Sequence, residues 1–174
     1  MPLINIKKIQ VVIVNKVRIL GVDPGYAIVG FGVLDYDGLR FTPVEYGAIL
    51  TEAGTPFPER LKAIRNDMEF IFGKYAPECM AIEKLYFNTN QKTGIDVAQA
   101  RGVTVLSAAE RNVPIFEYTP LQVKSAVVGY GKAEKKQIME MTRQLLGLAQ
   151  IPKPDDAADA LAIAICHGHS TRWG

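Results

Sequence analysis

The chain has 174 residues, of which 48% are hydrophobic and 22% charged, and its 20 Lys and Arg residues nearly balance its 18 Asp and Glu residues. A chain of this length forms one domain with a single core, and the composition excludes disordered, collagen-like and coiled-coil proteins. The net charge of +2 is too small to identify a partner. No apolar run approaches the ~20 residues that a membrane-spanning helix requires.

The first third of the chain predicts three strands. Residues 1–16 combine lysines with a short apolar run, which favours an extra edge strand or an irregular extension over an export signal. Residues 17–22 are apolar and stop at Asp-Pro-Gly, as a buried strand does before a sharp turn. Two β-prone runs, 28–35 and 39–50, are separated by a Tyr-Asp-Gly turn and predict a hairpin.

A helix, a strand, a second helix and a further strand follow. Apolar residues recur at three- and four-residue spacing from Pro58 until Pro77 ends the helix. Residues 79–83 predict a short strand, residues 95–111 a second helix and residues 114–118 another core strand.

The last third of the chain predicts three helices. Residues 119–127 begin with Thr-Pro, a cap followed by proline at the first helical position, and residues 133–146 predict the next helix. Residues 155–166 contain almost only Ala, Ile and Leu besides three aspartates, so this helix should be buried on most sides. Together these elements predict an α/β fold, a mixed five-stranded sheet with helices on both faces, over residues 17–169. A short tail at 170–174 would follow.

Four carboxylates stand where burial should exclude them. Asp23 and Glu83 end two predicted strands, and Asp156 and Asp159 share one face of the last helix because they are three residues apart. Sites in α/β proteins collect at strand ends, so we expect the four side chains to converge if this helix packs there. We assign the neighbouring Asp155 to capping of the helix.

Four carboxylates in a half-buried cleft need a compensating cation, since like charges raise one another's pKa. Oxygen ligands without His or Cys select Mg²⁺ or Mn²⁺ over zinc. An acidic cluster of this kind holds two metal ions ~3.5–4 Å apart and hydrolyses phosphodiesters. Each acid taken alone is explained as well by a turn or a cap, but two strand-end acids together with the Asp-x-x-Asp pair are not.

Six motifs extend this interpretation, namely GVDPG at 21–25, AIE at 81–83, AQARG at 98–102, FEYTPLQVK at 116–124, VVGYGKAEK at 127–135 and DDAADALAIAICH at 155–167. In this order they closely resemble the RuvC-type Holliday junction resolvases over residues 17–167. Some members carry His where this chain has Asp156. The resemblance implies an RNase H-like fold and a catalytic, metal-binding site at Asp23, Glu83, Asp156 and Asp159.

The resemblance also implies an activity and partners. It implies a homodimeric, cytoplasmic endonuclease that nicks four-way DNA junctions symmetrically in homologous recombination and DNA repair. Two Mg²⁺ ions per active site are expected, with Mn²⁺ able to substitute. The RuvA and RuvB branch-migration proteins are the implied protein partners, and no membrane is involved.

Five residues are candidates for DNA contact. Tyr86 matches an aromatic residue that stacks on a base at the opened junction, a contact worth ~1–3 kcal/mol. Lys124 and Lys135 match lysines that the family places near the scissile phosphate and the DNA backbone. Lys132 and Lys136 make the same stretch basic, although a short lysine cluster is usually only a solvated helix face.

The remaining reactive side chains are given structural roles. Cys79 and Cys166 form no ligand pattern and predict buried free thiols in a reducing cytoplasm. His167 and His169 are expected to interact with the end of the last helix rather than with a metal. Arg101, in the second predicted helix, is assigned no role.

Three alternatives compete with the resolvase. An actin-like or sugar-kinase-type ATP-binding module also opens with Asp-x-Gly, but it needs a second related domain and a second such loop. A non-catalytic junction-binding scaffold would not be expected to keep all four acids, because unneeded carboxylates in an apolar helix are destabilising. A nuclease of the same fold acting on RNA or on other branched DNA shares the metal chemistry, so the acids do not separate it from the resolvase.

Overall fold

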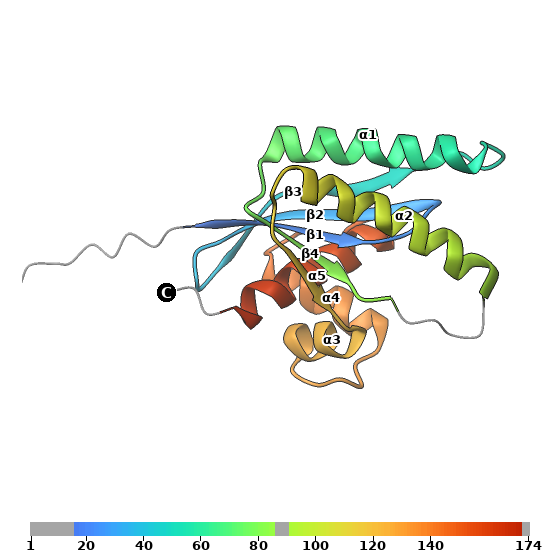
Figure 1. Cartoon of the computed structure of the whole chain (residues 1–174). Coiled ribbons are helices and arrows are strands. Elements are labelled where there is room, and N and C mark those ends of the chain that lie inside the picture. Colours follow the sequence, from blue (N-terminus) through green and yellow to red (C-terminus); the bar gives the residue numbers. More distant parts are fainter. Residues whose placement is uncertain (1–15, 86–90, 172–174) are drawn as a thin grey trace, which may run out of the picture.

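The structure of the protein is a computed structural model that describes residues 16–85 and 91–171 (Figure 1). The expected extension lies outside the described residues except for Lys16, and the end of the expected tail also lies outside them. The elements in chain order are β1 (Val17–Asp23), β2 (Ile28–Tyr36), β3 (Phe41–Leu50), α1 (Phe57–Tyr75), β4 (Cys79–Glu83), α2 (Gln91–Glu110), β5 (Ile115–Tyr118), α3 (Pro120–Val128), α4 (Lys135–Leu145) and α5 (Asp155–Ser170).

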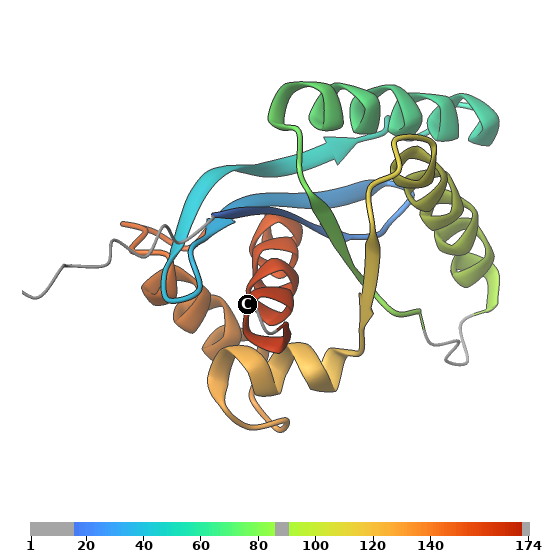
Figure 2. The same cartoon turned by 60° about the vertical axis from the view of Figure 1, so that its left-hand side comes forward.

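The five strands form one mixed sheet in the order β3-β2-β1-β4-β5. Strands β1, β2 and β3 are antiparallel neighbours, whereas β4 is parallel to both β1 and β5. Helices α1 and α2 cover one face of the sheet, and α3, α4 and α5 lie on the other (Figures 1 and 2). The predicted fold class is therefore confirmed. Because β1 and β4 are parallel, their C-terminal ends lie at the same edge of the sheet.

Strand β1 is central and is buried on both faces. Ile19 packs into the core beneath α5, whereas Leu20 and Val22 pack into the core beneath α1 and α2. All three side chains are fully buried. An apolar run without polar alternation is therefore what this strand requires, and the end of β1 is held in place from both sides.

Glycines in the sheet let the backbone of α5 lie directly against β1 and β2. A Cβ atom at Gly21 would lie 2.0 Å from the carbonyl oxygen of Ala160, and one at Gly30 would lie 2.0 Å from that of Asp156. Gly30 is also the β2 residue that pairs with Asp23. The first turns of α5, with their carboxylates, are therefore positioned over the end of β1.

Two helices are longer than predicted. Helix α2 begins at Gln91 rather than at residue 95, through a Thr-Gly pair that has low helix propensity. Helix α5 continues past residue 166 to Ser170, through a glycine. A Cβ atom at Gly168 would lie 2.4 Å from the ring of Phe41, so the packing of α5 against β3 requires glycine there. Tertiary contact thus overrides the helix-breaking tendency of this residue.

The prediction that Asp155 caps α5 is wrong. Pro154 occupies the N-cap position, and Asp155 is the first residue of the helix. The Asp155 carboxylate lies 3.0 Å from the ammonium group of Lys153, so it makes an ion pair instead of a capping hydrogen bond. The cap predicted for α3 is confirmed, because the Thr119 hydroxyl accepts a hydrogen bond from the backbone N–H of Gln122.

His167 makes the predicted contact at the end of α5, with its Nδ1 3.4 Å from the hydroxyl oxygen of Thr171, but it is also a core residue, which was not predicted. This side chain is fully buried, with its Nδ1 2.7 Å from the hydroxyl oxygen of Tyr118 and its ring centroid 4.4 Å from that of Phe116. Burial lowers the pKa of His167 to about 4. The ring is part of the core between α5 and β5, whereas Nδ1 of His169 lies 3.0 Å from the carbonyl oxygen of Ala126 in α3.

Both cysteines are buried and free, as predicted. Within the part of the chain that the structure describes, no helix is both long and apolar enough to cross a membrane.

Candidate active site

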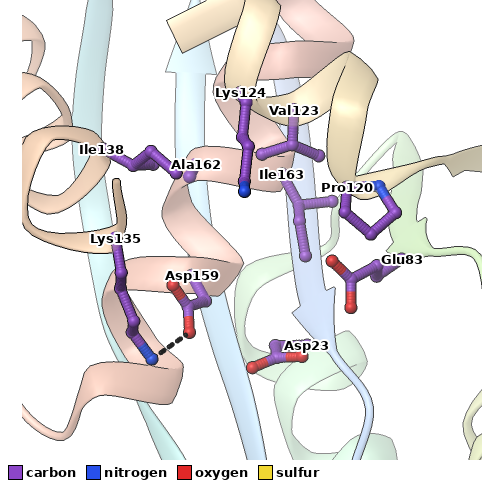
Figure 3. A pocket seen from close by; sticks show the side chains of 10 residues that line it. All are labelled: Asp23, Glu83, Pro120, Val123, Lys124, Lys135, Ile138, Asp159, Ala162 and Ile163. Carbon is purple, nitrogen blue, oxygen red and sulfur yellow. Dashed lines mark ion pairs between the residues drawn. The ribbon is translucent and has the colours of Figure 1, made fainter. Parts of the chain in front are cut away.

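Asp23 and Glu83 face a common pocket at the end of the sheet (Figure 3). Asp23 is the last residue of β1 and Glu83 the last residue of β4, so the parallel pairing of these strands brings them together. Asp159 reaches the same cavity, of about 360 Å³, from α5. Three of the four predicted carboxylates thus line one pocket although they are far apart in the sequence.

Asp156 lies beside this pocket rather than in its lining. It is partly buried in the first turn of α5, and its carbonyl oxygen lies over Gly30. Its negative charge raises the pKa of both Asp23 and Asp159. The fourth predicted carboxylate is therefore close enough to act on the other acids electrostatically.

Two lysines line the same pocket as the carboxylates. Lys135, the first residue of α4, places its Nζ 3.0 Å from Oδ2 of Asp159. Lys124 extends from α3 into the same pocket (Figure 3). The hydrogen bond to Asp159 raises the pKa of Lys135, so its ammonium group stays charged. A negatively charged phosphate entering the pocket would meet both ammonium groups.

The rest of the pocket wall is mostly apolar. It is formed by side chains from α3, α4 and α5, namely Pro120, Val123, Ile138, Ala162 and Ile163. An apolar wall lowers the local dielectric constant and so strengthens every charge interaction inside the pocket. Sequence analysis did not assign these residues to the site, because apolar residues on helices read as ordinary core.

The pKa values of the three carboxyl groups in the pocket are all raised. Burial and the charges of Glu83, Asp159 and Asp156 raise the pKa of Asp23 to about 8, in spite of the opposing charge of Lys135. Burial and the charge of Asp159 also raise the pKa of Glu83. Burial raises the pKa of Asp159, although its hydrogen bond with Lys135 works in the opposite direction. The two lysines of the pocket are therefore not enough to balance the charge of its carboxylates.

Divalent cations fit this donor set. All the acidic donors are oxygens, and four carboxylates against two ammonium groups leave an excess of negative charge. Within residues 16–85 and 91–171, no three Asp, Glu, His or Cys side chains lie close enough together to coordinate a metal ion as they stand. The carboxylates would therefore have to move closer to one another to bind a cation.

Two of the other predicted DNA contacts, Lys132 and Lys136, lie outside the pocket lining. Lys132 precedes α4 and Lys136 is its second residue, and both are exposed and absent from the pocket lining. Tyr86 lies outside the described residues, directly after the segment that follows Glu83.

Arg101 contacts the site although no role was predicted for it. Its Nε lies 3.3 Å from the backbone carbonyl oxygen of Glu83, and its guanidinium also forms an ion pair with Glu117. The signal in the sequence was a single arginine in the apolar stretch of α2, within the AQARG motif.

Comparison with known proteins places this site in a family. The family described as "Crossover junction endodeoxyribonuclease RuvC" matches residues 19–167. This chain belongs to the RuvC family. The RuvC of Alkaliphilus oremlandii is 57% identical over 152 residues, which cover 87% of this chain and 93% of that protein. The RuvC of Brevibacillus brevis is 59% identical over 150 residues, covering 86% and 90%.

Solved structures agree with this assignment. The structure of Thermus thermophilus RuvC in complex with a Holliday junction substrate superposes with a TM-score of 0.84 at 32% identity, covering 88% of this chain and 94% of that chain. The yeast mitochondrial Holliday junction resolvase Ydc2 has a TM-score of 0.65 at 16% identity and shares the fold. The RNase H-like fold expected from the motifs is thereby confirmed.

Proposed function

We propose that this RuvC-family protein resolves four-way DNA junctions by hydrolysing one phosphodiester bond in each of two strands. The proposal depends mainly on one observation, that Asp23, Glu83 and Asp159 line one pocket together with Lys124 and Lys135. Membership of the family makes junction DNA the first substrate to test, since a relative with the same fold is complexed with a Holliday junction.

Asp23, Glu83, Asp156 and Asp159 would hold the cations, with Mg²⁺ proposed as the natural ion and Mn²⁺ as a substitute. Two such ions, when bound, supply a water of lowered pKa and stabilise the leaving oxygen in phosphodiester hydrolysis. The raised pKa of the half-buried Asp23 supports this proposal, because a divalent cation would relieve the repulsion from the neighbouring carboxylates most directly.

The lysines act on the phosphate. Lys124 points its ammonium group into the cavity, where it would stabilise the negative charge that grows on the phosphate during cleavage. Lys135 holds Asp159 by an ion pair and would share its charge with the phosphate. The apolar wall that includes Val123 and Ile138 excludes bulk water from this face of the pocket.

Contacts with the DNA arms would lie around this pocket. Lys132 and Lys136 are exposed beside Lys135, where they would bind backbone phosphates without sequence preference. Tyr86 follows Glu83 by three residues, and we propose that it stacks on a base next to the cleaved bond.

Symmetric cleavage requires two active sites, so we propose a homodimer. Helix α2 exposes an apolar stripe at helical spacing, in which Ile95 is 58% and Leu106 is 53% exposed. Gly102 lies between them, and a Cβ atom there would have no neighbour within 4 Å. A stripe of this kind suits the close approach of a second α2 helix, which would place the two pockets of the dimer symmetrically.

The cellular context is proposed by the same reasoning. Resolution of junctions in recombination and repair follows branch migration, so we propose RuvA and RuvB as partners on the same DNA. Such an enzyme acts on chromosomal DNA, and we therefore place it in the cytoplasm.

Cleavage of a synthetic mobile four-way junction tests the proposed function. We expect paired, symmetric nicks in Mg²⁺ and in Mn²⁺, none in EDTA, and no cleavage of a linear duplex. Asp156→Asn should bind the junction without cutting it, while Asp155→Asn, the neighbouring control, should cut normally. Binding without cleavage by the wild-type protein would favour a scaffold, and absence of both would redirect the search to RNA-containing substrates.

A further inference from the structure

The strand that carries Glu83 is less supported at its end than in its middle. Strands β1 and β4 pair from Ile19 with Cys79 as far as Val22 with Ile82, so Glu83 lies one residue beyond their last pair. On the β1 side the chain continues from Asp23 into Pro24, which has no N–H to donate. On its other side β4 is held by β5, a strand of only four residues at the edge of the sheet.

Arg101 supplies the missing support from α2. Its Nε donates to the carbonyl oxygen of Glu83 at 3.3 Å, and its Nη2 pairs with the carboxylate of Glu117 on β5. The side chain is only 17% exposed, so its charge is shielded from water and fixed in position. One planar guanidinium thus joins helix α2, the end of β4 and the edge strand β5.

We propose that Arg101 is a positioning residue for the reaction, which holds the main chain of Glu83 so that its carboxylate faces the pocket. This inference rests on the proposed function, because it assigns Arg101 to the same site. Arg101 reaches Glu83 through the backbone and does not line the pocket itself. Its removal should therefore impair the chemical step more than DNA binding.

A small shift of Glu83 is enough for a large effect. Displacement of a reacting group by about 1 Å can lower a rate by about 100-fold. Strand β4 ends at Glu83, and directly beyond it the Lys84 N–H donates to the Tyr118 carbonyl at 2.8 Å. Without Arg101, nothing among the contacts of the described residues replaces its bond to the Glu83 carbonyl.

Arg111 offers a matched control. It lies one residue after α2, and its guanidinium also bonds both a carboxylate and a backbone carbonyl, those of Glu69 on α1. Its Nε lies 2.9 Å from the Glu69 carboxylate. Arg111→Gln thus removes a comparable anchor of the same region without touching Glu83.

The test compares Arg101→Gln, Arg101→Lys and Arg111→Gln with the wild type. For Arg101→Gln we expect kcat on the four-way junction to fall about 10- to 100-fold, while the junction Kd measured in EDTA stays within about 2-fold. Arg101→Lys keeps the positive charge but cannot bond the Glu83 carbonyl and the Glu117 carboxylate at the same time, so its kcat should lie between those of Arg101→Gln and the wild type. Arg111→Gln should change neither quantity by more than about 2-fold.

Hydrogen exchange of the metal-free protein gives a second readout that is independent of cleavage. The peptide containing the Lys84 amide should exchange faster in Arg101→Gln than in Arg111→Gln. If Arg101→Gln does not fold, Glu117→Gln takes its place, because its half-exposed carboxylate fixes the other side of the guanidinium. Equal kcat and equal exchange in the two arginine variants would overturn the inference, whereas a wild type that binds but never cuts would overturn the proposed function.

Discussion

Lys135 and Asp159 form an ion pair in the lining of the active-site pocket, with Nζ of the lysine 3.0 Å from Oδ2 of the aspartate. The pair joins the first turn of α4 to α5, and Lys135 also lies 3.9 Å from Oδ2 of Asp155. Lys135 is thus placed where it can balance the carboxylates in the free protein and meet a phosphate in the complex.

Replacement of Lys135 by alanine should therefore weaken both binding and cleavage. We expect cleavage of the junction to fall by about 10- to 100-fold, since one preorganised cation at the phosphate is lost. Single-turnover cleavage with excess enzyme measures the chemical step, and titration in EDTA measures binding. Lys153→Ala is the control, because Lys153 pairs with Asp155 and lies away from the pocket lining. Equal loss in both variants would show that only the overall positive charge matters.

The stability of the metal-free protein should depend on pH in a way that identifies Asp23. Its pKa is about 8 in the folded protein, against an ordinary value of 3.8, so between these values the folded state holds a proton that the unfolded state has released. The free energy of unfolding should then fall as pH rises from about 4 to 8, by about 1.4 kcal/mol per pH unit for one full proton. Glu83 and Asp159, whose pKa values are also raised, act in the same direction.

His167 should act in the opposite direction over part of this range. Its pKa is about 4 in the folded protein and 6.5 ordinarily, so between these values the unfolded state binds the extra proton. The stability that neutral His167 contributes is present above pH 6.5 and is lost as pH falls toward 4.

Urea unfolding in EDTA from pH 5 to 8 separates the effect of Asp23 from that of His167. Asp23→Asn should raise stability at pH 8, and His167→Gln should steepen the decline with rising pH between 5 and 6.5. Unchanged slopes in both variants would contradict these assignments.

The sequence was sufficient to predict the sheet because its strands are marked locally. The five strands differ from the structure by two residues at most at either end, since each is a β-prone run with a turn, a proline or an acid beside it. The convergence of Asp23 and Glu83 was expected because each ends a predicted strand, and the parallel pairing of β1 and β4 in the structure accounts for it.

Helix ends and cross-element contacts were not predictable in the same way. The continuation of α5 through Gly168 depends on the ring of Phe41, which is distant in the sequence. The burial of His167 depends on Tyr118 and Phe116 of β5. The hydrogen bond from Arg101 to Glu83 joins an arginine side chain to a backbone carbonyl. Every residue has such a carbonyl, so the residue types in the sequence do not indicate which one the arginine contacts.

Gly21 should be among the least replaceable residues of the fold. A methyl group there would lie 2.0 Å from the Ala160 carbonyl and would push α5 away from β1, so Gly21→Ala should destabilise the protein by about 1–3 kcal/mol and reduce cleavage. Gly73→Ala is the control, since a Cβ atom there meets nothing closer than Arg111 at 4.0 Å. This substitution in helix α1 should stabilise the protein by up to about 1 kcal/mol. Thermal unfolding compares the two, and equal melting temperatures would mean that α5 can shift without cost.

The α2 stripe allows the proposed dimer to be separated from the active site. Leu106→Glu places a charge at one end of the stripe and should convert the dimer into monomers, measured by analytical ultracentrifugation. Leu39→Glu, at the exposed turn between β2 and β3 on the far side of the sheet from α2, is the control, because Leu39 is 88% exposed.

The pocket is built within one chain, so monomers should keep the metal-site carboxylates but lose coordinated nicking. They should release singly nicked junctions where the wild type releases resolved duplexes. A Leu106→Glu protein that remains dimeric would place the interface elsewhere.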